Sequence, residues 1–155
     1  MNLVAGVLAI FLCALIGYFF SLKHKEREIF YKDFSDFNKV FKKEIEFSKS
    51  SLFSIIDENY KSDGDFYRIV KDVVKNKKKF DKNIKYLSKE EISFFENYIN
   101  CLGTGDVFSQ KDFISSASGT IEEKYKISVE NTKKYRNFYL KIGILAGLLI
   151  LVLLL

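Results

Sequence analysis

The sequence closes with KIGILAGLLILVLLL (residues 141–155), and no charged side chain follows Lys141. At about 1.5 Å per residue, a helix over residues 142–155 reaches about 21 Å, which is short of a hydrocarbon core of about 30 Å. If the helix is counted from Phe138 and the Lys141 ammonium extends back to the headgroups, it reaches about 27 Å. We therefore predict a minimal transmembrane helix over residues 138–155.

The opposite end, MNLVAGVLAIFLCALIGYFFSL (residues 1–22), also lacks charge. As a helix it reaches about 33 Å, which is enough to span a bilayer. A cleaved signal peptide would need basic residues before the apolar run and small residues near its end, where Tyr18, Phe19 and Phe20 stand instead. We predict that residues 1–22 are a retained transmembrane helix.

All 25 basic and 20 acidic side chains lie between the two apolar ends or at their margins. Positively charged loops stay on the cytoplasmic side of a membrane. We therefore expect residues 23–137 to form a cytosolic domain, with the protein in the cell membrane and both termini outside. The flanking basic residues that carry this argument are Lys23, Lys25, Arg27, Lys133, Lys134, Arg136 and Lys141.

Small side chains recur at steps of four in both predicted spans. Such stripes let helix backbones approach closely in lipid, where packing drives association. We predict that they pack the spans together, within one chain or between chains; the alternative is that small residues are simply common in spans. The stripe residues are Ala5, Ala9, Cys13 and Gly17 in the first span, and Gly143 and Gly147 in the second.

The middle segment has no proline, and its apolar residues recur at steps of three and four. A stripe that begins at Phe30 predicts a helix from the first span to about residue 58. Asp63-Gly64 marks a turn before a second helix, and Ser88 with Glu91 forms a predicted capping box for a third. The expected fold is all-α: a long helical hairpin with shorter helices packed on it, anchored by N- and C-terminal transmembrane helices.

A fourth helix is predicted to run unbroken into the closing span. Positions seven residues apart from Val107 to Ile142 form a stripe typical of a coiled coil. Gly103 suits the end of the preceding helix, and Asp106 suits the cap of this one. Gly119 weakens the helix by about 1 kcal/mol relative to alanine, which predicts either a close neighbour or a local bend there.

Residues for catalysis are few. The one histidine, His24, adjoins the predicted membrane, which disfavours a Ser/His or Cys/His nucleophile pair. Cys13, His24 and Cys101 are too scattered for a zinc site. GTGD (residues 103–106) is too short for a phosphate loop and follows a helix, where such loops follow strands. We predict no enzyme, no catalytic residue, no metal and no cofactor.

The segment KDVVKNKKKFDKNIK (residues 71–85) concentrates lysines. Lysines without arginines are poorly suited to recognise nucleic-acid bases, but they attract anionic lipid headgroups or an acidic protein surface. A plain solvated surface is the alternative. Because no nucleic-acid-binding motif is recognisable, we expect no nucleic acid partner. Lys77, Lys78 and Lys79 are the candidate contact residues at its centre.

The chain resembles the stage III sporulation protein AB family of endospore-forming bacteria. LGTGDVFSQ is similar to that family's L-G-x-x-D-x-x-x-Q segment at Leu102, Gly103, Asp106 and Gln110, and KEIEFSKSSL is similar to its E-I-x-[YF]-x-x-x-x-L segment from Glu44. The closing span is similar too, including both glycines. Family members usually have one proline after the position of the Glu26-Arg27 pair and another before that of Leu52, and they have tryptophans. This chain has neither residue type, which favours a straighter first helix.

The resemblance implies a non-enzymatic platform subunit in the mother-cell membrane around the forespore, needed for forespore development after engulfment. It implies partners in a secretion-like sporulation complex, including the AAA-like secretion ATPase, stage III sporulation protein AA. It makes Leu102, Gly103, Asp106, Gln110 and Glu44 candidate structural or contact residues. A membrane-anchored helical adaptor or regulator outside any transport machine remains the alternative, and a homo-oligomer stays open.

Overall fold

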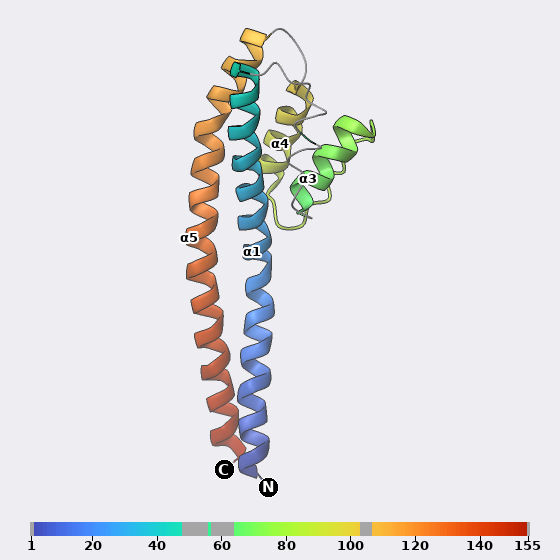
Figure 1. Ribbon diagram of the computed structural model, residues 1–155. Coiled ribbons are helices and arrows are strands. Elements are labelled where there is room, and N and C mark those ends of the chain that lie inside the picture. The colour runs from blue at the N-terminus through green and yellow to red at the C-terminus, as the bar shows by residue number, and fades with distance from the viewer. Residues whose placement is uncertain (1, 48–55, 57–63, 103–106, 155) are drawn as a thin grey trace. The chain divides into compact units, whose positions relative to one another are not determined.

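The computed structural model describes residues 2–47, 56, 64–102 and 107–154, and every regular element in these residues is a helix (Figure 1). The all-α class is therefore confirmed for the described chain. The chain divides into two compact units, a terminal unit (Met1–Glu28 with Ile127–Leu155) and a central unit (Ile29–Lys126). The elements are α1 (Asn2–Phe47), α3 (Asp65–Val70), the π-helical turn η1 (Lys71–Lys75), α4 (Lys89–Cys101) and α5 (Val107–Leu154).

The terminal unit consists of the first part of α1 and the last part of α5, which run antiparallel. Gly17 lies against the backbone of Tyr139, and Gly147 lies against Ile10. The N- and C-terminal ends of the chain consequently lie at the same end of this unit (Figure 1). The predicted hairpin, in which the first and last helices run antiparallel, has this arrangement of the two ends.

Large apolar side chains on the terminal unit face outward. Phe11, Phe19, Leu145 and Leu149 are each at least 60 % exposed. In the described part of the chain, one helical segment, Phe108–Leu153, is long and apolar enough to cross a membrane. This suggests association with a membrane. The N-terminal transmembrane helix over residues 1–22 remains a prediction.

The central unit has an aromatic core. The predicted stripe of α1 is buried, with Phe34 and Phe37 fully enclosed. The Phe34 ring lies 5.1 Å from the ring of Phe66 on α3 and 4.7 Å from that of Tyr98 on α4, between ring centroids. Edge-to-face and offset contacts of this kind add to the burial of apolar area. α1 continues to Phe47; the predicted extension to residue 58 lies largely outside the described residues.

The start of α4 confirms the predicted capping box. The Ser88 hydroxyl oxygen accepts a hydrogen bond from the Glu91 amide at 3.2 Å, and the Glu91 carboxylate accepts one from the Ser88 amide at 2.9 Å. Two amide donors that the helix leaves unpaired are thus satisfied. Phe95 and Ile99 then follow on the buried face of α4.

α5 is a continuous helix, as predicted, but its seven-residue stripe turns away from the interior. Ile121 and Ser128 are buried, whereas Ile142 is 49 % exposed. A straight helix drifts by about 20° per seven residues, which explains the rotation. At Gly119 the expectation of a close neighbour is wrong: beyond the nearby backbone of α5 itself, a side-chain Cβ there would meet no described atom within 4 Å.

Candidate functional site

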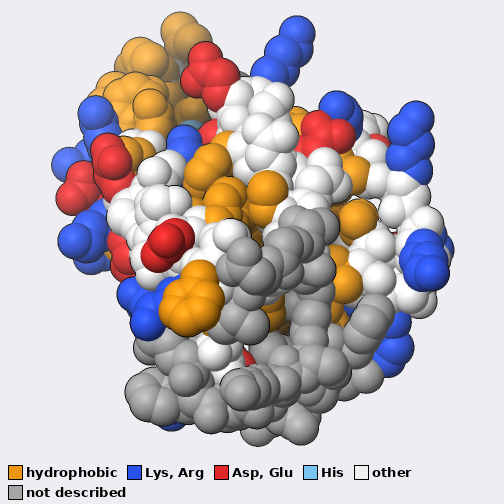
Figure 2. Space-filling model, turned by 90° about the horizontal axis from the view of Figure 1, so that it is seen from above, with side chains coloured by type: hydrophobic (Ala, Val, Ile, Leu, Met, Phe, Trp, Pro, Cys, Tyr) orange, Lys and Arg blue, Asp and Glu red, His pale blue; other side chains and the backbone are white. Residues whose placement is uncertain are grey.

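The lysine-rich segment consists of η1 and the irregular stretch that follows it, and apolar side chains at its end tie it to the core of the central unit. Phe80 packs edge-on against Phe95 with ring centroids 5.7 Å apart, and Ile84 and Leu87 are buried. The lysines just before Phe80 (Lys77, Lys78 and Lys79) and those after it (Lys82 and Lys85) are exposed. The face drawn in Figure 2 carries Lys and Arg side chains around its edge. The segment thus presents charge from a fixed backbone.

Part of this lysine cluster has a local folding role. Lys77 adopts a positive φ of 51°, and the Lys78 amide turns back to donate to the Asp72 carbonyl at 2.9 Å. This geometry ends a helix, and cations near a helix C-terminus are stabilised by its dipole. The Lys78 ammonium also lies 3.0 Å from the Asp72 carboxylate. Hydrogen bonds from Asn76 and Lys78 lower the pKa of Asp72.

Other lysines of the segment remain available for a partner. Lys82 forms an ion pair with Glu96 at 2.6 Å. Lys77, Lys79 and Lys85 are exposed and form no ion pair or side-chain hydrogen bond with another described residue. Of the three predicted contact residues, Lys78 is thus engaged by Asp72, whereas Lys77 and Lys79 are not, and a contact role for the segment stays a prediction.

The predicted helix break at residues 102–110 is described only in part. Leu102 is buried, and its amide donates to the Ile99 carbonyl at 3.1 Å, ending α4 in an extended conformation. Gln110 on α5 and Glu44 on α1 are half-buried. Gly103 and Asp106 lie outside the described residues. A contact role for this group stays a prediction.

Three glycines of the predicted spans lie where the two terminal helices approach closely. A Cβ on Gly17 would lie 2.5 Å from the Tyr139 carbonyl oxygen, and one on Gly143 would lie 2.6 Å from the Cys13 carbonyl oxygen. One on Gly147 would lie 2.5 Å from the Cα of Ile10. Only glycine fits at such distances. The side chain of Ala9 lies outside the described residues, and packing of this pair within lipid stays a prediction.

A buried polar network joins three helices of the central unit. The Tyr98 hydroxyl on α4 donates to the Asn38 side-chain oxygen at 2.8 Å, and the Asn38 amide donates to the Ser118 hydroxyl on α5 at 2.8 Å. Burial raises the pKa of Tyr98, so its proton stays in place. The sequence analysis missed this network. The sequence offered one sign of it: Asn38, four residues after Phe34, is a polar residue within the apolar stripe of α1.

Two carboxylates extend the same contacts. The Tyr31 hydroxyl donates to Glu91 at 2.8 Å, and the Ser35 hydroxyl donates to Glu122 at 2.7 Å. The Lys39 ammonium lies 2.6 Å from Glu122, and its hydrogen bond, with that of Ser35, lowers the pKa of Glu122. These bonds fix how α1 sits against α4 and α5 within the central unit. In the described residues, no group of three His, Cys, Asp or Glu side chains could hold a metal ion.

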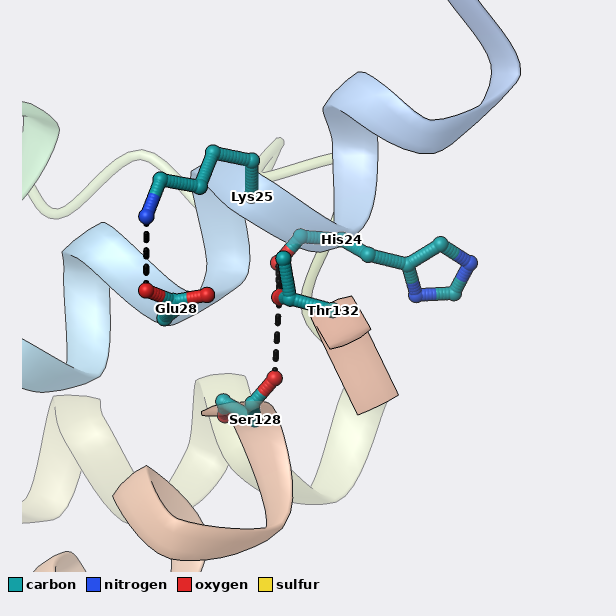
Figure 3. A network of polar contacts seen from close by, with 5 residues as sticks. All are labelled: His24, Lys25, Glu28, Ser128 and Thr132. Atoms are coloured by element: carbon teal, nitrogen blue, oxygen red, sulfur yellow. Dashed lines mark hydrogen bonds and ion pairs between the residues drawn. The ribbon is translucent and has the colours of Figure 1, made fainter. Parts of the chain in front are cut away.

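A second set of polar contacts joins α1 and α5 in the terminal unit (Figure 3). The Thr132 hydroxyl lies 2.9 Å from both the His24 and the Ser128 carbonyl oxygens. The His24 ring stacks on that of Tyr135 at 4.2 Å between centroids and points away from the Lys25–Glu28 pair. Burial lowers the pKa of His24, with smaller effects from Lys23 and Arg27. The stacking on Tyr135 makes His24 a packing residue between α1 and α5.

Comparisons with known proteins give one family. No curated protein and no solved structure matches the chain. The family model for stage III sporulation protein AB matches residues 2–155. Since the match covers both units, the chain belongs to the stage III sporulation protein AB family.

Proposed function

We propose that the chain is a non-enzymatic membrane platform subunit on the mother-cell side of the sporulation channel, where it couples a cytosolic ATPase to partners in the membrane. The observation that carries the proposal is the family match over residues 2–155, which supports a role in sporulation. The family is not one of known enzymes. The action of the protein would then lie in its contacts with other subunits.

The construction of the two units supports a platform role. The terminal unit carries exposed apolar side chains and a helix able to cross a membrane. The central unit carries an aromatic core and buried hydrogen bonds between its helices. α1 and α5 are unbroken and contribute to both units. A load on the central unit would therefore act on the same two helices that form the membrane anchor.

The lysine-rich segment is the surface that we assign to the ATPase. Its backbone is anchored by Phe80, Ile84 and Leu87, so the partner would meet an ordered surface with little ordering entropy to lose. Exposed lysines favour a partner with an acidic face. The ATPase proposed here is stage III sporulation protein AA, and both chain termini would lie on the far side of the mother-cell membrane.

The test is a charge reversal in the native host. A strain lacking the gene is complemented with wild type or with the triple variant Lys77→Glu/Lys79→Glu/Lys85→Glu at equal membrane abundance. We expect the variant to lower co-purification of the ATPase by roughly tenfold or more, because like charges would face each other in the interface. Counts of heat-resistant spores, taken after engulfment is scored by microscopy, should fall with it.

A second triple variant, Lys32→Glu/Lys43→Glu/Lys89→Glu, changes the net charge equally at exposed positions outside the segment. It should behave as wild type. If both variants lose the ATPase equally, the lysine-rich segment is not the contact. If the deletion strain forms normal numbers of heat-resistant spores, the platform assignment itself is wrong.

A further inference from the structure

The terminal unit contains a groove of about 340 Å³ between α1 and α5. This volume is within the range of small-molecule sites, which starts at about 300 Å³. One wall is formed by α1 and the other by α5, and the lining mixes apolar and charged side chains. The lining residues are Tyr18, Ser21, Leu22, Lys25, Glu28, Val129, Thr132, Lys133 and Arg136.

The groove carries a net positive charge, and only one of its three basic side chains is held in an ion pair. The Lys25 ammonium is held by the Glu28 carboxylate at 2.6 Å, as Figure 3 shows. Lys133 and Arg136 are exposed, and their side chains form no ion pair or hydrogen bond with another described residue. They lie three residues apart on α5, a spacing that places two side chains on one helix face. Lys133 and Arg136 therefore line the groove without an ion pair to a described residue, since the Glu28 carboxylate is engaged by Lys25.

Hydroxyl groups in the groove are already engaged. The Ser21 hydroxyl donates to the Tyr18 carbonyl at 2.7 Å, and the Thr132 hydroxyl is bound to backbone carbonyls. Neither supplies a free donor for a neutral polar ligand. A ligand would consequently be selected by Lys133 and Arg136, and so by negative charge. Arginine binds phosphate oxygens through two parallel N–H groups, and lysine binds them as a point charge.

The position of the groove relative to the predicted spans favours a phospholipid headgroup as the anionic ligand. Tyr18 and Leu22 belong to the predicted first span, while Lys133 and Arg136 come shortly before the predicted second span at residue 138. In the membrane-anchored protein, the groove would lie at the level of the cytosolic headgroups, with its apolar wall toward the acyl chains. Basic pockets between transmembrane helices bind phospholipid headgroups.

We propose that this groove binds the phosphodiester headgroup of an anionic glycerophospholipid, with Arg136 and Lys133 on the phosphate and Tyr18 and Leu22 against the upper acyl chain. The proposal rests on the membrane anchoring in the proposed function. A lipid seated there contacts α1 and α5 together. It therefore strengthens the helix pair on the cytosolic side.

The test uses the full chain, purified in dodecyl maltoside and analysed by native mass spectrometry after addition of equal amounts of phosphatidylglycerol or phosphatidylcholine. Lys133 and Lys134 are adjacent, identical and exposed, but only Lys133 lines the groove. We expect wild type to retain phosphatidylglycerol in preference to phosphatidylcholine. Lys133→Gln and Arg136→Gln should each reduce this retention about fivefold, the effect of one cation near an anionic surface. Lys134→Gln should leave it unchanged.

Equal losses in Lys133→Gln and Lys134→Gln would overturn the proposal, because they would mean diffuse attraction. Displacement of the lipid by millimolar inorganic phosphate would also overturn it, since the groove would then be a site for free phosphate. Carbonate washing of membranes tests the membrane anchoring separately from the lipid site. Release of the chain by carbonate contradicts the anchoring itself, whereas firm retention without a lipid preference contradicts the groove alone.

Discussion

The terminal and central units share α1 and α5 but bring the two helices together by different means. In the terminal unit, Gly17 and Gly143 place backbone against backbone, and large apolar side chains point outward. In the central unit, Phe34 and Phe37 fill the interior, and Asn38 bridges to α4 and α5. Water drives aromatic side chains inward, whereas lipid offers them no such drive and leaves close packing as the main attraction.

The largest effect is expected from opening the aromatic core. Phe34→Ala removes a fully buried ring and should lower the free energy of unfolding of the central unit by about 3–5 kcal/mol. Guanidinium unfolding of the full chain in detergent, followed by tyrosine near-UV circular dichroism, measures this loss. Phe108→Ala is the matched control, because Phe108 is 81 % exposed. Equal effects of the two changes would contradict the core described here.

A smaller loss is expected from the buried network. Asn38→Leu leaves the hydroxyls of Tyr98 and Ser118 without their interhelix partner, and should lower the free energy of unfolding by about 2–3 kcal/mol. The double variant Asn38→Leu/Tyr98→Phe removes one of the stranded hydroxyls and should recover part of the loss. A double-mutant cycle in the same unfolding assay measures this coupling. If the effects of Asn38→Leu and Tyr98→Phe on the free energy of unfolding simply add, the hydrogen bond between Tyr98 and Asn38 contributes nothing to stability.

The same substitution at two glycines of α5 should act in opposite directions. Gly143→Ala places a Cβ against the Cys13 carbonyl and should destabilise the helix pair by about 1–3 kcal/mol. Gly119→Ala meets no neighbour and should stabilise the helix by about 1 kcal/mol. Thermal unfolding of the two variants in detergent gives the sign of each change. A stabilising Gly143→Ala would mean that the terminal helices do not approach closely.

The smallest expected effect is the pH dependence of the stability that Glu122 contributes. Hydrogen bonds from Lys39 and Ser35 lower the pKa of Glu122 below its usual 4.5. Because the unfolded chain binds the proton more readily, this contact stabilises the fold above about pH 4.5, and the stabilisation is lost as the pH falls through the lower folded value. Glu122→Gln should therefore destabilise the protein near pH 7, and progressively less as the pH falls below about 4.5. Unfolding midpoints across this range measure it, with the exposed Glu123→Gln as control.

Several features followed from short stretches of sequence. The aromatic stripe of α1 and the Ser88–Glu91 capping box depend on residues three or four positions apart, and both were predictable. The family was recognisable from LGTGDVFSQ and the closing span, and the match over residues 2–155 confirms it. At Gly119 one of the two predicted alternatives, a close neighbour, was wrong, because helix propensity reports the weakness of a helix position and carries no information on its neighbours.

The lysine-rich segment shows how far local reasoning reaches. Its composition predicted an exposed basic surface, but the sequence did not show that Lys77 and Lys78 end a helix or that Lys82 is held by Glu96. The first feature depends on one positive φ angle and the second on contact with another helix. The ion pairs of Lys78 with Asp72 and of Lys82 with Glu96 reduce the set of lysines that a partner could use, whereas the Lys77 side chain stays exposed.

By itself the sequence determined the helical class, the two apolar ends and the family, because periodicity, capping and hydropathy depend on neighbours within a few residues. Only the tertiary structure decided which polar groups are buried and paired, which glycine is confined, and which cations line the groove of the terminal unit. Asn38 and Ser118 are far apart in the chain, as are Gly17 and Tyr139. Their distances are set by the packing of whole helices, and no local pattern encodes them.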